Sequence, residues 1–382
     1  MPRPHLIAAL LCLTVAGTAS ASPTFRVTPD TLRADADGTW NLWIEVANDT
    51  GTRGVYADSL SVRYRNDDPD RSREPAQGGY ELDALGRMIP PSGAGERNGI
   101  TYSAPAAFDR GTLVFRFVAH DDERSYVMES TVHVVGNAFS EAHPPVMLQV
   151  GTQRTDMVVI GARDASGPAR TLLFVPPAGV PARSLMRWGT GVAARGWNVG
   201  IVSLPGAGRS TGERDGAGPA SVAVVGAAVR ELARTAGVDP ARIVLWGERE
   251  GGTTALLAAD SKSPVQGVVA VDAWLDPWAA YRALDDAEQR AFRTAAGSDS
   301  AAWRARSALV AATRPTVPVL LVQSSEARAA DTGPATAYEA ARRAKGLAVE
   351  TRLSPSEPRP LRKPDVQRIV LGFAERRTGG GN

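Results

Sequence analysis

Residues 243–252 read Ile243-Val244-Leu245-Trp246-Gly247-Glu248-Arg249-Glu250-Gly251-Gly252. The first four are apolar without interruption, which is typical of a strand that is buried on both faces of a sheet. Two glycines, Gly247 and Gly251, then enclose Arg249. Glycine permits a sharp turn and a close approach of two backbone segments. The segment therefore predicts a buried strand, a tight turn at Arg249 and a helix that starts at once.

Similar apolar runs recur on both sides of this segment, at residues 172–175, 199–204, 268–271 and 319–322. Helix-like stretches separate them: residues 221–235 carry apolar side chains at helical spacing and stop at Gly237, and a last helix starts near Pro364. Strands that alternate with helices in this way form a parallel sheet covered on both faces. The fold class predicted for residues 146–376 is therefore α/β, a doubly wound and mostly parallel sheet.

The preceding part of the chain has a different pattern. Apolar residues alternate with polar ones in residues 40–46, 60–64, 113–117 and 126–135, and turn-rich stretches at 66–77 and 90–98 lie between these runs. This pattern predicts a small all-β sandwich, immunoglobulin-like in kind, over residues 22–136. Residues 137–145 are predicted to be a linker, and residues 377–382 a flexible tail.

The first 21 residues have the pattern of a secretory signal peptide. Arg3 and His5 precede the apolar run Leu6–Val15, and small residues at 19–21 suit cleavage before Ser22. The expected location is therefore periplasmic or secreted. The run is too short to span a bilayer, and no later segment approaches the length required. The single cysteine, Cys12, lies within the run, so the mature chain would have no thiol.

Composition argues against several kinds of partner. The 382 residues are 43% hydrophobic and carry a net charge of only +2, which gives no basic field for nucleic acid. His120 and His133 fall on strands without metal-ligand spacing around them, and the glycines near Ser210 lack the Lys-Ser/Thr ending of a phosphate-binding loop. We expect no metal and no cofactor, and the sequence predicts no oligomeric state.

Three segments make residues 146–376 resemble the α/β-hydrolase superfamily, in particular its secreted esterase and prolyl-oligopeptidase-like branches. Residues 243–252 are similar to the strand, elbow and helix that carry the pattern G-x-S-x-G. Residues 319–327 look like the penultimate strand and the acid-bearing loop. Residues 355–364 look like the P-G-E-G-H loop before the last helix. The resemblance implies that the nucleophile, acid and histidine positions are Arg249, Ala327 and Arg359.

None of these residue types can perform hydrolase chemistry. A guanidinium stays protonated and only donates hydrogen bonds, so Arg249 cannot attack a carbonyl. Alanine has no carboxylate with which to orient an imidazole. The four histidines, at positions 5, 120, 133 and 143, all precede the hydrolase-like region, so it has no general base of the usual kind. The sequence therefore predicts a pseudoenzyme.

Several other residues were candidates for a site. Ser210 lies in Gly208-Arg209-Ser210-Thr211-Gly212, but the polar, glycine-rich stretch that follows predicts a structural loop similar to the family's R-G-x-G-x-S-x-G loop. Asp272 and Asp276 could act as acids, although structural hydrogen bonding is the simpler interpretation. Trp274 and Trp278 would line the mouth of the site or pack beneath a helical cap at residues 285–311.

The leading hypothesis is a secreted pseudohydrolase that acts by binding or scaffolding, with the β-sandwich as a second contact. Its ligand would be an anionic small molecule or an acidic protein segment, because two arginines would replace a serine and a histidine. Candidate ligand-binding residues are Arg249, Glu250, Arg359, Ser210, Trp274 and Trp278. Glu248 or Glu250 is expected to balance the charge of Arg249. The alternatives are an active serine hydrolase with an atypical site that uses Ser210, and an adhesion module led by the β-sandwich.

Overall fold

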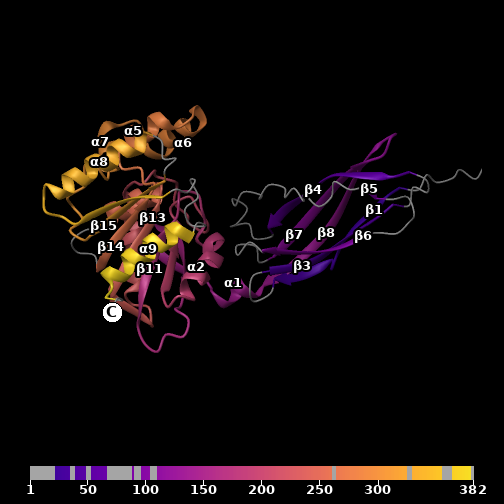
Figure 1. Cartoon of the computed structure of the whole chain (residues 1–382), viewed down its shortest axis with the longest axis horizontal. Helices are drawn as coiled ribbons and strands as arrows, with labels where there is room; N and C mark the ends of the chain where they lie inside the picture. The colour runs from indigo at the N-terminus through magenta and orange to yellow at the C-terminus, as the bar shows by residue number, and fades with distance from the viewer. Residues whose placement is uncertain are drawn as a thin grey trace, which may run out of the picture.

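A computed structural model of the chain describes residues 22–34, 39–48, 53–66, 88–89, 96–103, 110–259, 264–324, 329–354 and 364–379 (Figure 1). The expected signal peptide, Ala327 and Arg359 lie outside these residues. Among the helices of the described part, none is long and apolar enough to cross a membrane.

The C-terminal part is built on one sheet of eight strands, as the α/β pattern predicts. In chain order these are β9 (Val146–Val150), β10 (Gln153–Ile160), β11 (Ala169–Val175), β12 (Asn198–Val202), β13 (Val238–Glu248), β14 (Val265–Val271), β15 (Val319–Ser324) and β16 (Val349–Ser354). Their spatial order is β16-β15-β14-β13-β11-β12-β10-β9. Only β10 runs antiparallel to its neighbours, and the other pairings are parallel.

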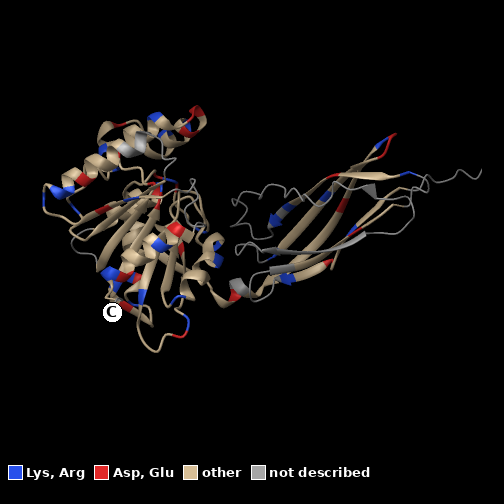
Figure 2. Cartoon of the chain, in the orientation of Figure 1, with Lys and Arg blue, Asp and Glu red and all other residues tan. Residues whose placement is uncertain are grey.

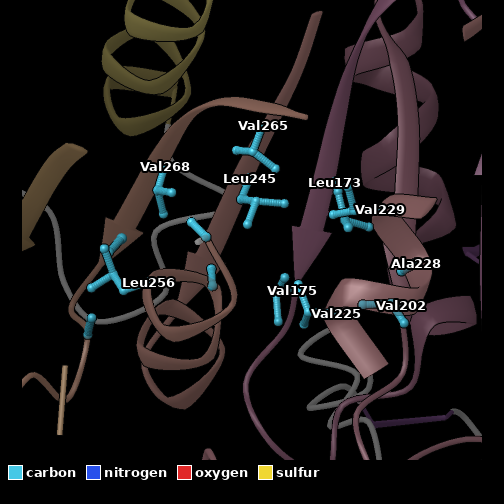
Figure 3. Packing of buried hydrophobic residues seen from close by; sticks show 14 of the residues in the cluster. Leu173, Val175, Val202, Val225, Ala228, Val229, Leu245, Leu256, Val265 and Val268 are labelled. Atoms are coloured by element: carbon cyan, nitrogen blue, oxygen red, sulfur yellow. The ribbon is translucent and has the colours of Figure 1, made fainter. Parts of the chain in front are cut away.

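Helices cover both faces of this sheet. They are α2 (Met186–Ala193), α3 (Pro219–Leu232), α4 (Glu250–Ala258), α5 (Pro277–Ala283), α6 (Asp286–Ala296), α7 (Ser300–Ala305), α8 (Ala329–Arg343) and α9 (Pro364–Arg377), with a 3-10 turn at Ala182–Leu185. Leu173 and Leu245 pack with α3 and α4 on one face, as Figure 3 shows. Phe174 and Trp246 pack with α2 and α9 on the other face. Burial on both faces explains why the strands read as continuous apolar runs.

The N-terminal part forms two further sheets. A three-stranded sheet has the order β1-β3-β6, and a five-stranded sheet has the order β2-β8-β7-β4-β5. The strands are β1 (Thr24–Thr28), β2 (Thr31–Ala34), β3 (Thr39–Ala47), β4 (Val55–Asn66), β5 (Met88–Ile89), β6 (Glu96–Ser103), β7 (Gly111–His120) and β8 (Ser125–Asn137). Leu42 and Ile44 of one sheet share a core with Leu60 and Phe115 of the other. The predicted sandwich is therefore present.

Elements of the structure reach into three of the predicted connecting segments. β8 runs to Asn137 and helix α1 (Ala138–Ala142) follows directly, so the expected linker contains a helix. At the start of the expected tail, α9 continues through Arg377 and the Thr378 amide donates to the Ala374 carbonyl at 3.0 Å. Arg377 also pairs with Glu350 of β16, which holds the end of the helix on the sheet. The turn-rich stretch at 90–98 includes the start of β6.

Candidate functional site

The turn between β13 and α4 has the strained backbone of an elbow. Arg249 adopts φ 50° and ψ −120°, a region that side chains other than glycine rarely occupy. Its amide donates to the Val271 carbonyl at 2.8 Å, and its carbonyl accepts from the Thr253 amide at 3.1 Å. Such strain costs about 1–3 kcal/mol and persists only where the surroundings fix the backbone. The strained conformation is therefore kept at Arg249 although an arginine occupies the turn.

Two glycines make this elbow possible. A Cβ atom on Gly251 would lie 2.2 Å from the Val175 carbonyl oxygen, and one on Gly247 would lie 2.3 Å from the Gly251 carbonyl oxygen. Both contacts are with backbone atoms, which cannot move aside as the end of a side chain can. The glycines therefore allow α4 to pack directly against β11 and β13.

Glu250, one of the two acids expected to balance the charge of Arg249, pairs with a different arginine. Its side chain is only 2% exposed and accepts hydrogen bonds from Arg214 Nη2 at 2.8 Å and from the Ala217 amide at 3.1 Å. Glu250 is the first residue of α4, so its side chain turns toward the loop after β12 whereas Arg249 points to solvent. The ion pair that forms is the one with Arg214, which joins this loop to the elbow.

Arg249 lies instead beside Trp274 and Asp272. The Arg249 guanidinium carbon is 5.6 Å from the centre of the Trp274 ring, within the range of a cation–π contact. Asp272 follows β14 at φ 46° and accepts from the Ser324 amide at 2.8 Å. Burial raises the pKa of Asp272, and the charge of Arg249 partly opposes that shift. The carboxyl ends of β13 and β14 thus bring a cation, a carboxyl group and an indole together.

The remaining aromatic and acidic candidates belong to the packing of the cap. Asp276 accepts from the Trp278 amide at 3.0 Å and so caps α5, in line with the structural interpretation. Trp278 stacks on Trp303 with ring centres 4.0 Å apart, and Trp274 packs on Phe292. The predicted helical cap consists of α5, α6 and α7 and starts at Pro277, before the expected residue 285. In Figure 1 these helices lie together beyond the ends of the strands.

Ser210 is not at an elbow. It lies in a turn after β12, and the next helix, α3, starts only at Pro219. The positive φ of 54° falls on Gly208 rather than on the serine. Ser210 Oγ is buried and has no hydrogen-bond partner among the described residues, so no base activates it there.

A buried acid that the sequence did not single out holds this loop. Asp156 of β10 is 1% exposed and accepts from the Arg209 amide at 2.9 Å. Burial raises its pKa, and the bonds from Arg209 and Ser203 oppose the shift. Asp156 and Arg214 were missed because they follow no known motif. The one available signal was an acid directly before the apolar run at residues 157–160.

None of the three histidines that the structure describes lies near Arg249. His120 bonds to Asp58 with Nδ1 2.7 Å from Oδ1, and His133 lies on β8, both in the β-sandwich. His143 precedes β9, which is separated from β13 by four strand spacings of about 4.8 Å, roughly 19 Å in all. The described residues hold no cluster of side chains that could bind a metal ion. The positions of Ala327 and Arg359 relative to Arg249 lie outside the described residues.

The architecture matches solved peptidases. An acylaminoacyl peptidase in complex with a chloromethyl ketone aligns with 72% of this chain and 49% of its own at a TM-score of 0.53 and 14% identity. A puromycin hydrolase aligns with 70% of this chain and 46% of its own at 0.54 and 18% identity. A puromycin-hydrolyzing peptidase from Mycobacterium tuberculosis aligns with 89% and 52% at 0.55 and 18% identity.

This chain thus spans about half the length of the peptidases that it matches. At such identities the likeness establishes the fold: a mostly parallel α/β-hydrolase sheet preceded by β sheets, as in prolyl-oligopeptidase-type structures. No family model matches the sequence, and no curated protein matches it.

Proposed function

We propose that this chain, whose C-terminal part has the α/β-hydrolase fold, is a non-catalytic protein that acts by binding at the former nucleophile elbow. One observation carries the proposal. The turn between strand and helix has the strained backbone that presents a nucleophile in this fold, with φ 50° at its central residue. That central residue is Arg249. A guanidinium has no lone pair with which to attack and stays protonated, so the elbow presents a permanent cation.

The ligand that suits this cation is an anion. Arg249 is exposed and has no ion pair with a carboxylate among the described residues, since Glu250 is bound by Arg214. The Trp274 ring lies beside its guanidinium and leaves the donor groups available to a carboxylate or phosphate. Asp272 is the competing internal acid, but burial raises its pKa and its Oδ1 already accepts a hydrogen bond from the Ser324 amide. We therefore propose an anionic small molecule or the acidic segment of a protein as the ligand.

Titration of the full chain tests this proposal. Calorimetry with phosphate, with acetate and with short acidic peptides should show binding that Arg249→Ala weakens, whereas Arg234→Ala, which removes an exposed arginine just after α3, should not. Arg359→Ala should weaken the same binding if that residue shares the site. Turnover of ester or aminoacyl-arylamide substrates that disappears in Ser210→Ala would establish the alternative, an active hydrolase with an atypical site.

The location proposed for the mature protein is the periplasm or the medium outside the cell. The basis is the signal-peptide pattern in residues 1–21. Intact mass of the exported protein should correspond to a start at or near Ser22. A product that keeps Met1 and fractionates with membranes would refute this part of the proposal.

A further inference from the structure

The outer face of the five-stranded sheet carries three arginines on adjacent strands. Arg63 and Arg65 lie on β4 and Arg116 lies on β7, and all three are exposed, whereas Val62, Phe115 and Phe117 of the same strands are buried in the sandwich core. None of the three forms an ion pair with a residue that the structure describes. Blue segments along these strands mark basic residues in Figure 2. We call these three residues the arginine face.

The strand register fixes the spacing of these charges. Arg63 and Arg65 are two residues apart on one strand, so their Cα atoms are about 6.8 Å apart. Arg116 pairs with Ser61 across the sheet, which places it diagonally from Arg63 at roughly 7–8 Å. The three cations therefore form a compact group on a rigid surface, and the pairing of β4 with β7 fixes the distances between them.

Neighbouring side chains only partly offset this charge. Glu129 of β8 lies opposite Arg116 and is the acid closest to the group in the register. Asp58, farther along β4, is bound to His120. His133 lies opposite Thr112, which itself pairs with Arg65, so this histidine would add charge only when protonated. Among the residues that the structure describes, the three arginines outnumber the acids beside them.

Apolar side chains lie among the arginines. Val114 is paired with Arg63 and is half-buried, and Val118 is paired with Val127, which is 55% exposed. Arginine is enriched at protein–protein interfaces. The valines beside the arginines give the face some apolar contact area as well as charge, which suits a polypeptide better than a uniformly charged polymer.

We propose that the arginine face binds an extended, acidic protein segment whose carboxylates occur at alternate residues. Alternate side chains of an extended chain point the same way and repeat at about 6.8 Å, which equals the spacing of Arg63 and Arg65. Guanidinium groups hold carboxylates through two parallel hydrogen bonds. This site is separate from the elbow and does not depend on the function proposed for Arg249.

Fluorescence anisotropy with two labelled decapeptides tests the proposal. One alternates Glu and Thr, and the other has the same composition with its five Glu residues in one block. The full chain should bind the alternating peptide more tightly. The triple variant Arg63→Ala, Arg65→Ala and Arg116→Ala should weaken that binding roughly tenfold, given the usual strength of exposed ion pairs. Binding should also weaken as salt rises.

A control with the same change in net charge is the triple variant Arg195→Ala, Arg234→Ala and Arg304→Ala, which removes exposed arginines from the α/β part. It should bind the peptide as wild type does, and so should Arg249→Ala. The triple variant in which the same three arginines are replaced by lysine should bind with intermediate affinity. Lysine keeps the positive charge but cannot donate the two parallel hydrogen bonds of a guanidinium. Circular dichroism checks that each variant is folded.

Equal losses in the two alanine triples would overturn the proposal, because net charge alone would then account for binding. Equal affinity for the two peptides would show that the spacing of the carboxylates does not need to match the spacing of the arginines, which would also overturn the proposal. Binding of sulfated glycan or of vesicles with anionic lipid, without binding of either peptide, would assign the face to a different partner and refute the proposal.

Discussion

The turn at Arg249 and the loop at Ser210 have the same sequence pattern, two glycines that enclose a central residue at a spacing of two. Their structures differ throughout. In the first, the positive φ falls on the central residue and a helix starts at the next position. In the second, the positive φ falls on Gly206 and Gly208, and no helix begins before Pro219. The comparison teaches that a nucleophile position is marked by the strand and helix on either side rather than by the glycine pattern.

The two regions are also held by different forces. At the elbow, the two glycines let backbone segments pack so closely that no Cβ atom would fit between them. In the loop, a buried carboxyl group, Asp156, accepts from backbone and side chain. Glu250 joins the two regions through Arg214. The shape of the elbow is thus a property of the whole sheet end, which explains how it can persist without a serine.

The largest expected difference between the two regions concerns their glycines. Gly251→Ala should lower the free energy of unfolding by about 3 kcal/mol, because the new Cβ would meet the Val175 carbonyl oxygen at 2.2 Å. Gly212→Ala should cost less than about 1 kcal/mol, because its Cβ would meet only the end of the Gln153 side chain, which can rotate away. Urea unfolding measures both. Equal costs would mean that the elbow is no more constrained than the loop.

The next effect is at the link between the regions. Glu250→Gln should lower the free energy of unfolding by about 2 kcal/mol, because a buried carboxylate that accepts from Arg214 and the Ala217 amide is lost. A double-mutant cycle with Arg214→Ala should give a coupling of about 1 kcal/mol. Additive effects in this cycle would show that the ion pair does not join the loop to the elbow.

The loop should respond to pH through Asp156. Its pKa in the folded chain is raised above the ordinary value of 3.8, so its contribution to stability is complete below that pH and is lost as pH rises through the folded pKa. Asp156→Asn should remove this part of the pH dependence. Since burial also raises the pKa of Asp272, the difference between wild type and variant is the quantity to measure. Parallel stability curves for the two proteins would contradict the assignment.

The smallest effect is expected at Ser210. Its Oγ is buried without a hydrogen-bond partner among the described residues, so Ser210→Ala should change the free energy of unfolding by less than about 0.5 kcal/mol. Thermal unfolding checks this value. A loss of 2 kcal/mol or more would mean that the hydroxyl is bonded in solution and that the loop is organised around it.

Much of the fold could be predicted because the signals were local. Continuous apolar runs at Leu172–Val175 and Ile243–Trp246 predicted strands buried on both faces, and alternation at Leu113–Phe117 predicted a half-exposed strand. The end of the elbow strand could be placed because Gly247 and Gly251 bracket it. The short strands and the helix α1 within the expected linker were missed, because segments of four or five residues are stabilised by tertiary pairing rather than by their own pattern.

The partners of the site could not be predicted for a similar reason. Glu250 was expected to face its neighbour Arg249, but adjacent residues at a helix start point in different directions, and a loop residue 36 positions earlier supplies the arginine that binds it. The cation–π contact of Arg249 depends on the path of the chain after β14. Only the three-dimensional arrangement of strand ends determines such contacts.

We propose that the elbow keeps the shape of a nucleophile turn without a nucleophile, and one measurement tests this proposal most directly. The purified full chain is incubated with a fluorophosphonate probe and its intact mass is determined, alongside Arg249→Ser as a matched variant. We expect no adduct on wild type, because Arg249 cannot react, and none on Arg249→Ser, because no histidine follows His143 in the sequence. A stoichiometric adduct on any serine of the wild-type chain would contradict the account.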